Sequence, residues 1–431
     1  MAAASVVAPA LTRIALLSSE PVRPRMAGIG IRYLELARRL PAKGIEIVLV
    51  SPAAPEETRT LSGLGDVAVR GFEPGRLAAL LAGCDGAVAQ GQLANDLLLE
   101  MPDLPVAIDL YDPWLIENFA YLETLGLDPY RNDHATWVLQ MSRGDFFLCS
   151  SEEQRTFYLG FLAALGRVNP ERMAGDPDLA DLIAAVPFGV PDDLPPHRPL
   201  LPPRTAGEAR LLFGGLYDWY DPWTLLDALE GLQQPWTLLL IRNPNPESTP
   251  QRLFAEVEAR CRALGWWGGR VQVLDWVPAE RRYDLLREVD LLVAPHRPSL
   301  ETRLSLRTRF LDALAAGCPV VTSEGGAMSR LLAEHRAGWL VPPCDATALT
   351  RALTEALDAP ESRRTGAREL AVFLGWDRVL APLVRFCREP RIDGTKERFA
   401  RRAETVAPRD RLGFRLRRKL RLWRNRWRGS A

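Results

Sequence analysis

The sequence predicts an α/β protein built from two doubly wound domains, each with a parallel β-sheet between layers of helices. Three observations lead to this fold class. Short apolar runs alternate with segments of helical periodicity, a pattern typical of βαβ units. A proline-rich stretch at 191–203 interrupts the alternation, which then begins again. The chain of 431 residues, 47% of them hydrophobic, is long enough for two domains with sizeable cores.

The first domain is expected over residues 1–200. A first strand is followed by the glycine-containing stretch MAGIGIR and the helix-like RYLELARRL. Seven short apolar segments have the composition of buried strands. They are RIALLSS at 13–19, IEIVLVS at 45–51, DVAVR at 66–70, GAVAQ at 86–90, PVAID at 105–109, DFFLCS at 145–150 and IAAVP at 183–187.

A second domain of similar size is expected over residues 201–375. TALTRALTEAL at 347–357 has apolar residues at helical period. Residues 376–392 read as a further helix, and 393–431 form a polar and then strongly basic tail. The strands expected in this domain are RLLFGG at 210–215, WTLLLI at 236–241, RVQVL at 270–274, DLLVAP at 290–295 and PVVTS at 319–323.

The composition narrows the classes of protein. No run of about 18 apolar residues is present, so we expect nothing to span a bilayer. The N-terminus lacks the basic region of a secretory signal. The six cysteines and four histidines show no metal-ligand spacing, which indicates reduced thiols in a cytoplasmic protein and no metal site.

The densest group of charges lies between Glu301 and Asp312, in ETRLSLRTRFLD. It follows the predicted strand at 290–295, so the charges occupy a loop and the first turns of a helix that ends at Gly317. In open α/β sheets, ligands bind at the carboxyl ends of the strands. The cluster is therefore a candidate ligand site.

Arg309 and Asp312 are three residues apart and share one face of that helix. Arginine binds phosphate through two hydrogen bonds, and a helix N-terminus also favours an anion. A carboxylate one turn deeper suits sugar hydroxyls, so the pair predicts a site for a nucleotide diphosphate. The loop at Gly325-Gly326 adds backbone N–H groups at the end of the next strand. The alternative is a solvated surface network of Glu301, Arg303, Arg307, Arg309 and Asp312.

The segment FLDALAAGCPVVTSEGGAMSRLLAEHRAGWLVPPCDATAL, at 310–349, resembles the donor-binding segment of glycosyltransferase family 4. The shared pattern is an acidic residue, a glycine, Pro-Val-Val, a Gly-Gly turn and Gly-x-Leu-Val-x-Pro. The resemblance extends more weakly over about 13–390. It implies the GT-B fold, in which two Rossmann-like domains face each other across a cleft. It also implies that the helix from Trp376 crosses back onto the N-terminal domain.

The resemblance implies roles for single residues. Asp312 would hold the donor ribose and Arg309 the diphosphate. Gly28 and Gly30 would let an N-terminal loop approach the donor phosphates. The complete expected donor-binding set is Gly28, Gly30, Gly214, Gly215, Arg303, Arg307, Arg309, Asp312, Gly325 and Gly326.

Two departures from the family pattern define a variant ETR…RTR…D subgroup. The family's first glutamate falls at Leu304, so Glu301 is expected to act in catalysis from an altered loop. The Arg…Lys pair that usually follows the Gly215 position is replaced by Leu216 and Asp221. Arg309, helped by Arg303 or Arg307, is expected to bind the phosphates instead.

Two further candidates for catalysis lie in AIDLYDPWLIE, at the end of a strand in the first domain. Asp109 and Asp112 are expected to face the place where an acceptor binds. The alternative for Asp112 is a turn before Pro113. His296 is expected to be structural.

These observations predict a metal-independent glycosyltransferase that takes a sugar from a nucleotide-sugar, with retention of configuration and no cofactor. The acceptor is expected to be a lipid-linked or cell-surface glycan precursor of bacterial polysaccharide biosynthesis. One alternative is a nucleotide-sugar epimerase of the same fold, which needs histidine or carboxylate pairs for acid–base work. The other is a non-catalytic nucleotide-binding relic, which the missing Arg…Lys pair favours.

The basic tail suggests a location. Residues 409–428 carry a net charge of +9, so the rest of the chain sums to −9. Because an apolar stripe recurs at helical spacing among these charges, the tail is expected to lie on an anionic membrane at its cytoplasmic face. A disordered tail, a helix docked on its own chain and a nucleic-acid arm are the alternatives, the last opposed by the acidic body. The stripe is Leu412, Leu416, Leu420, Trp423 and Trp427.

Overall fold

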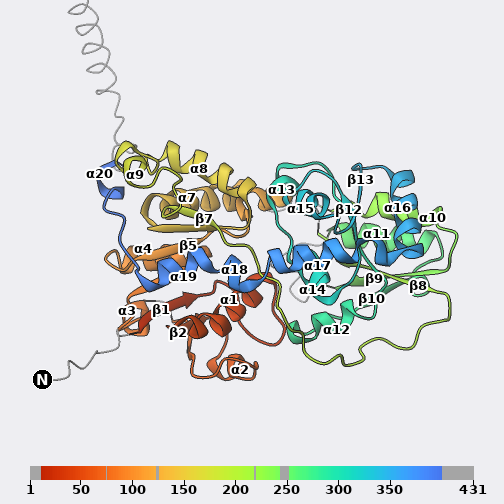
Figure 1. Cartoon of the computed structure of the whole chain (residues 1–431), viewed down its shortest axis with the longest axis horizontal. Helices are drawn as coiled ribbons and strands as arrows, with labels where there is room; N and C mark the ends of the chain where they lie inside the picture. Colours follow the sequence, from red (N-terminus) through yellow and green to blue (C-terminus); the bar gives the residue numbers. More distant parts are fainter. Residues whose placement is uncertain (1–10, 74, 123–125, 218–219, 243–251, 400–431) are drawn as a thin grey trace, which may run out of the picture.

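The computed structural model describes residues 11–399 apart from 74, 123–125, 218–219 and 243–251. The chain forms two α/β domains, which lie side by side along the long axis of the molecule (Figure 1). Each domain has one parallel sheet with helices on both faces, so the predicted fold class is confirmed. Within the described residues, no helix has the length and apolar character needed to cross a membrane.

The N-terminal sheet has seven strands in the order β3-β2-β1-β4-β5-β6-β7, all parallel. All seven predicted strands of this domain are present. Their bounds are β1 Thr12–Leu17, β2 Ile45–Ser51, β3 Ala68–Gly71, β4 Gly86–Ala89, β5 Val106–Asp109, β6 Phe146–Cys149 and β7 Ile183–Ala185.

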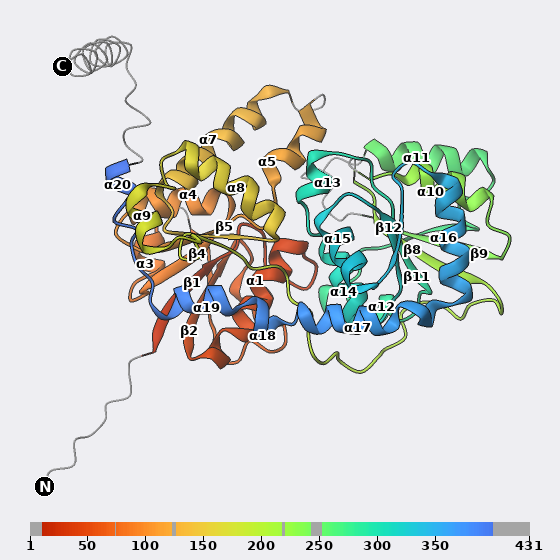
Figure 2. The same ribbon diagram turned by 45° about the horizontal axis from the view of Figure 1, so that its top comes forward.

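Alternate residues of β1 feed two separate apolar layers. Ile14 and Leu16 pack towards α1 and the returning helices α18 and α19, whereas Ala15 and Leu17 pack towards α4, α7 and α8. Figure 2 shows these two groups of helices on opposite sides of the sheet. The helices of this domain are α1 Gly28–Arg39, α2 Pro55–Arg59, α3 Leu77–Leu80, α4 Gly91–Glu100, α5 Trp114–Glu117, α7 Leu127–Arg143, α8 Glu152–Ala164 and α9 Pro170–Gly175, with 3-10 turns η1 Pro41–Lys43 and η2 Asn118–Tyr121.

The C-terminal sheet has six parallel strands in the order β10-β9-β8-β11-β12-β13. The five predicted strands are confirmed, and a sixth, β13, forms from the short run WLV that the sequence reading did not pick out. The bounds are β8 Ala209–Gly215, β9 Trp236–Ile241, β10 Val271–Leu274, β11 Leu291–Ala294, β12 Val320–Ser323 and β13 Trp339–Val341.

The helices of the C-terminal domain also cover both faces of its sheet. Leu211 and Phe213 of β8 pack towards α10, α11 and α16, and Leu212 packs towards α12, α14, α15 and α17. The bounds are α10 Pro222–Glu230, α11 Arg252–Ala263, α12 Arg282–Leu286, α13 Leu300–Leu304, α14 Thr308–Ala316, α15 Ala327–His335, α16 Ala346–Asp358 and α17 Arg364–Phe373, with η3 Ala279–Arg281 and η4 Pro360–Arg363.

The structure corrects two predicted segments. The stretch after β11, expected to be a loop, contains the short helix α13, whose first turn is capped by Ser299 through a hydrogen bond from the backbone N–H of Thr302. The helix expected over 376–392 is divided into α18 (Trp376–Val379) and α19 (Ala381–Arg388). Pro382 lies in the first turn of α19, where a proline is tolerated, so a new helix begins there.

The two chain segments that connect the domains lie side by side. Val190 and Gly375 form a parallel bridge, with a 2.8 Å hydrogen bond from the N–H of Val190 to the carbonyl of Leu374. Trp376 packs directly on Gly189, where an added Cβ would lie 2.3 Å from the indole ring. Gly189 is therefore required by close approach, and α18 and α19 then run back over the N-terminal domain (Figure 1).

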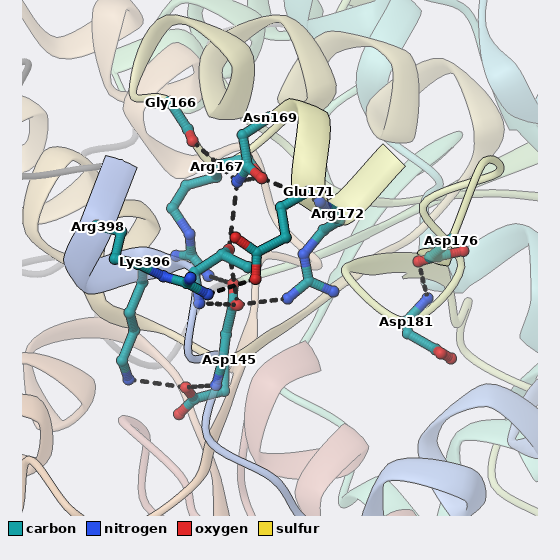
Figure 3. Close-up of polar contacts among 12 residues, drawn as sticks. Asp145, Gly166, Arg167, Asn169, Glu171, Arg172, Asp176, Asp181, Lys396 and Arg398 are labelled. Carbon is teal, nitrogen blue, oxygen red and sulfur yellow. Dashed lines mark hydrogen bonds and ion pairs between the residues drawn. The ribbon is translucent and has the colours of Figure 1, made fainter. Parts of the chain in front are cut away.

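A network of charges ties the end of the described chain to the N-terminal domain (Figure 3). Asp393 accepts a 2.7 Å hydrogen bond from Arg167 and forms an ion pair with Arg172, also at 2.7 Å, and Lys396 lies 2.7 Å from Asp145. Because Arg167 is fully buried, this is an internal network and not a surface one. The helix α20 (Lys396–Phe399) follows, and the predicted membrane segment 409–428 lies outside the described residues.

Candidate active site

A cavity of about 360 Å³ lies between the two domains. Its N-terminal wall comes from the loops after β1 and β5, and its C-terminal wall from the segments that follow β8, β10 and β11. Both walls lie at the carboxyl ends of parallel strands. In each sheet the strand order reverses at these positions, beside β1 and β8, which is where open α/β sheets bind ligands.

Two arginines of the predicted cluster, Arg307 and Arg309, line the C-terminal wall. Arg309 donates hydrogen bonds to the carbonyl oxygens of Phe213 at 2.7 Å and Gly215 at 3.4 Å. Both guanidinium groups lie against the buried ring of Tyr220, at 4.8 and 4.5 Å from its centroid. The ring and the backbone thus hold two positive charges in place before any ligand arrives.

Two helices direct their N-termini at the cavity. Gly28 opens α1, and Thr308 and Arg309 open α14; neither helix has a side-chain cap hydrogen bond. Free N–H groups at such ends bind anions. Gly30 is one turn inside α1, where an added Cβ would lie 2.9 Å from the carbonyl oxygen of Pro21. Gly30 therefore serves packing, whereas Gly28 has open space around it.

Asp312 also lines the cavity, one turn after Arg309. Its Oδ1 accepts a 3.0 Å hydrogen bond from Nε of Arg282, whose Nη2 in turn donates to the hydroxyl of Tyr283 at 2.6 Å. Burial raises the pKa of Asp312, and the Arg282 charge opposes that rise. Asp312 thus presents a buried carboxylate, held by Arg282 and Tyr283, beside the arginine wall.

The N-terminal wall is acidic. Glu20, Asp112 and Glu117 line it, and Tyr111 lies between them and the loop of Arg307. Burial raises the pKa of Asp112 to about 7, reinforced by the nearby Glu20 and Asp109. Burial also raises the pKa of Glu117 well above its usual range, and that of Glu20 to a smaller extent. These carboxyls line the same cavity as Arg307 and Arg309, on the opposite wall.

Glu301 and His296 lie behind the cavity wall and do not line it. Glu301 is 4% exposed, and its Oε2 accepts a 2.6 Å hydrogen bond from Arg307 while Oε1 has no partner. His296 is 3% exposed and packs edge-on against Tyr220 at 4.9 Å. Burial and the two arginines lower its pKa well below the usual value, so it is neutral near pH 7, as a structural histidine would be.

The structure does not place Asp109 in the cavity, contrary to expectation. Its carboxylate is buried and accepts hydrogen bonds from Arg32, 2.7 Å from Nε and 3.2 Å from Nη2. The guanidinium carbon of Arg32 in this pair lies 4.5 Å from the centroid of the Tyr111 ring. A carboxylate so fully engaged supports the wall and does not face an acceptor.

Three of the expected donor-binding residues lie elsewhere. Arg303, Gly325 and Gly326 line a second groove, of about 640 Å³, between α13 and α15 on one side and α8 on the other. Gly28, Gly214, Gly215, Arg307, Arg309 and Asp312 line the first cavity, and Gly30, inside α1, lines neither hollow. The short helix α13 places the two groups apart, because it separates Arg303 from the arginines that follow it.

The sequence reading missed several residues of the cavity. Glu20 follows β1 in the loop before the glycines, and Glu117 ends the very segment in which Asp112 was singled out. Arg282 and Tyr220 carry no local motif. Only the carboxylate of Glu117, five residues after Asp112, gave a signal that could have been used. Among the described residues, no three His, Cys, Asp or Glu side chains come together as a metal site.

Two Rossmann-like domains that face each other across a cavity form the GT-B fold. The comparison with protein families agrees, because residues 209–359 match the model described as Glycosyl transferases group 1. The C-terminal domain is thus similar to the group 1 glycosyltransferases, in agreement with the resemblance found in residues 310–349.

Related proteins support the same class over most of the chain. Phosphatidyl-myo-inositol mannosyltransferase of Mycobacterium leprae is 25% identical over 86% of this chain and 96% of its own length. The structure of sucrose-phosphate synthase from Thermosynechococcus elongatus matches with a TM-score of 0.63 at 17% identity, over 88% of this chain and 98% of that one. HepE of Anabaena, solved with UDP and glucose, matches with a TM-score of 0.56 at 15% identity, over 87% and 98%.

Proposed function

We propose that the chain transfers a sugar from a nucleotide-sugar donor to a hydroxyl of a glycan or lipid-linked acceptor, with retention of configuration. The observation that carries this proposal is the wall formed by Arg307, Arg309 and the N-terminus of α14, with Asp312 one turn deeper. Cations and free N–H groups suit a diphosphate, and a carboxylate suits a ribose. HepE, which shares the fold, was solved with UDP and glucose.

In this mechanism the bond between the sugar C1 and the donor phosphate oxygen breaks, and a bond from C1 to the acceptor oxygen forms. The acceptor proton passes to an oxygen of the departing phosphate. Arg307 and Arg309 stabilise the negative charge that develops there, since preorganised charges in a closed site act without reorganisation. Glu301 positions Arg307 through its 2.6 Å hydrogen bond and touches no substrate. Asp112 is the carboxyl that contacts the acceptor.

We also propose that transfer needs neither a metal nor a cofactor, because the arginines supply the positive charge. Activity that survives treatment with a chelator would support this. Loss of activity on chelation and its return with a divalent cation would contradict it. The anomeric configuration of the product, measured by NMR before mutarotation, tests retention separately.

A thermal-shift screen against UDP-, GDP-, ADP- and TDP-sugars tests the donor. A ligand at about 100 times its dissociation constant adds about 2.7 kcal/mol of stability. The stabilised complex is then assayed for transfer. Conversion of the nucleotide-sugar without an acceptor would favour the epimerase, although no histidine is among the described residues that line the cavity. Binding without turnover of any kind would favour the non-catalytic relic.

One feature supports a lipid-linked acceptor at the cytoplasmic face of a membrane. Phe119, Leu122, Leu127 and Tyr130 have exposures of 37–53% and follow directly after Glu117 of the cavity. In Figure 2 the helices α5 and α7 project from the N-terminal domain beside α13. Such an apolar surface next to an acceptor site suits an acyl or polyprenyl chain.

Liposome flotation tests this membrane proposal with three proteins. These are the full chain, a truncation after Pro408 that removes the basic segment 409–428, and Leu127→Ser in the apolar surface. We expect the truncation to lose binding to anionic vesicles and its salt dependence. Leu127→Ser should keep salt-dependent binding but weaken transfer to a lipid-linked acceptor. Flotation of all three proteins alike would contradict the role of the tail.

A further inference from the structure

The two walls of the cavity carry opposite charges. The N-terminal wall carries three carboxyl groups, those of Glu20, Asp112 and Glu117. None of the described residues that line this wall is Lys, Arg or His. The arginines that line the cavity all come from the C-terminal domain. The cavity thus has a cationic side, which faces the donor in the proposed function, and an acidic side, which faces the acceptor.

The cations of the cavity are already engaged by neighbouring groups. Arg307 is paired with Glu301 at 2.6 Å. Arg282 is paired with Asp312 at 3.0 Å and also lies 3.8 Å from Glu35 of α1 in the N-terminal domain. Arg309 donates to two backbone carbonyls. These contacts hold the guanidinium groups on the C-terminal wall. The guanidinium groups therefore do not form ion pairs with the carboxyls of the N-terminal wall.

The three carboxyls of the N-terminal wall have no such partners. None of them forms an ion pair with a described residue; Glu117 accepts only a long hydrogen bond of 3.4 Å from the hydroxyl of Ser305. The nearest buried cation of their own domain, Arg32, is bound bidentately to Asp109. Burial is the main cause of the raised pKa of all three carboxyls, and the charges of Arg32 at Asp112 and of Arg307 at Glu117 offset it only in part.

From this asymmetry we propose that Glu20, Asp112 and Glu117 select an acceptor whose sugar, around the reacting hydroxyl, is neutral, and reject one that bears a phosphate or carboxylate there. The inference rests on the proposed transferase function and concerns the specificity of that same site. Sugar hydroxyls form hydrogen bonds with these carboxyls in either protonation state, whereas an anion repels each carboxyl that is ionised, which is unfavourable in a partly buried cavity. A phosphate farther along a lipid-linked acceptor is compatible, since it lies outside the cavity.

The test compares three acceptors on one scaffold: a methyl hexoside, its 6-phosphate and the corresponding uronic acid. Binding to the protein saturated with the nucleoside diphosphate of its donor is measured by calorimetry, and transfer is measured with the intact donor. We expect the neutral glycoside to bind at least 10-fold more tightly than either anion and to be the better acceptor. Raising the salt concentration should narrow the difference.

Variants assign the selectivity to the wall. At pH 8, above the pKa of about 7 of Asp112, Glu20→Gln and Asp112→Asn should each narrow the ratio between the affinities for neutral and phosphorylated glycosides by severalfold, because each removes one repelling charge. Glu56→Gln, on the exposed surface of α2, should leave the ratio unchanged. A wild-type protein that binds the phosphate as tightly as the neutral glycoside, or binds neither, would overturn the proposal.

The two proposals fail in different ways. A protein that binds nucleoside diphosphate and prefers the neutral glycoside, yet transfers nothing, would contradict the transferase function while the selectivity of the wall stands. A protein that transfers sugar to phosphorylated and neutral acceptors equally would contradict the selectivity while the transferase function stands.

Discussion

The hydroxyl of Tyr111 donates a 2.8 Å hydrogen bond to the carbonyl oxygen of Leu306. A side chain of the N-terminal domain therefore contacts the loop that carries Arg307 and Arg309 of the C-terminal domain. We expect Tyr111→Phe to cost about 0.5–1.5 kcal/mol of stability, the usual value of one hydrogen bond. It should also lower kcat/KM, since the closed form of the cavity loses a link. Urea unfolding and transfer kinetics check this, and Thr354→Val, which removes an exposed hydrogen bond to the carbonyl of Thr350, is the control.

Breaking the pair of Glu301 and Arg307 should destabilise the protein. Both side chains are at least 90% buried, so Glu301→Gln leaves an uncompensated guanidinium in the interior. The expected cost is about 3–5 kcal/mol. Glu334→Gln, which breaks an exposed pair with Arg330, should cost less than about 1 kcal/mol. If urea unfolding finds Glu301→Gln as stable as the wild type but inactive, Glu301 acts on substrate and not through Arg307.

Arg309 and Arg303 should differ in their effect on nucleotide binding. Arg309 lines the cavity, so Arg309→Ala removes a charge-assisted hydrogen bond to the diphosphate of about 1.5–3 kcal/mol. Affinity should fall roughly 10- to 100-fold. Arg303 lines the second groove, and Arg303→Ala should leave affinity unchanged. If calorimetric titrations find equal losses of nucleotide affinity in the two variants, the donor contacts both the cavity and the second groove.

The raised pKa of Asp112 predicts a pH-dependent cost. Its pKa is about 7 in the folded chain against 3.8 ordinarily, so the folded state binds the proton more tightly than the unfolded state does. The penalty is therefore absent below about pH 4 and grows up to about pH 7. Asp112→Asn should stabilise the protein at pH 8 by at least about 1.4 kcal/mol, the value of one pKa unit, and much less at pH 5. Thermal unfolding of both proteins at the two pH values measures this, and equal differences would contradict it.

The network around Asp393 should anchor the end of the described chain. Burial alone would raise the pKa of Asp393. Arg167 and the hydrogen bonds from Thr395 nevertheless lower that pKa to about 2. Asp393→Ala leaves the fully buried Arg167 unpaired and should cost about 3–5 kcal/mol. The exposed pair of Glu171 and Arg398 provides the control, and Glu171→Ala should cost less than about 1 kcal/mol. Comparable costs in urea unfolding would show that the network adds little.

The strands and the α14 site could be predicted from sequence because their signals are local. The signal for the α14 site consists of adjacent residues: an apolar run, then a group of charges, then a helix that ends at Gly317. Gly317 does adopt the left-handed conformation, with φ of 70°. The position of Asp109 could not be predicted in this way. Its partner Arg32 is 77 residues away in the sequence, and no motif around either residue indicates that the two form an ion pair.

The acidic wall escaped prediction for the same reason. Glu20 and Glu117 belong to loops after different strands, and only the strand order brings them to one cavity. The separation of Arg303 from Arg307 was missed because a five-residue helix in a charged loop has almost no periodic signal.

The bridge between Val190 and Gly375, with Trp376 seated on Gly189, has a consequence for motion. Both chain segments that connect the domains meet at this bridge. The domains are therefore linked at one junction and not at two separate ones. We therefore expect the domains to separate by rotation about this bridge, which would break contacts such as that of Tyr111 with Leu306. A side chain larger than hydrogen at position 189 would displace Trp376 and so disturb the junction about which that rotation takes place.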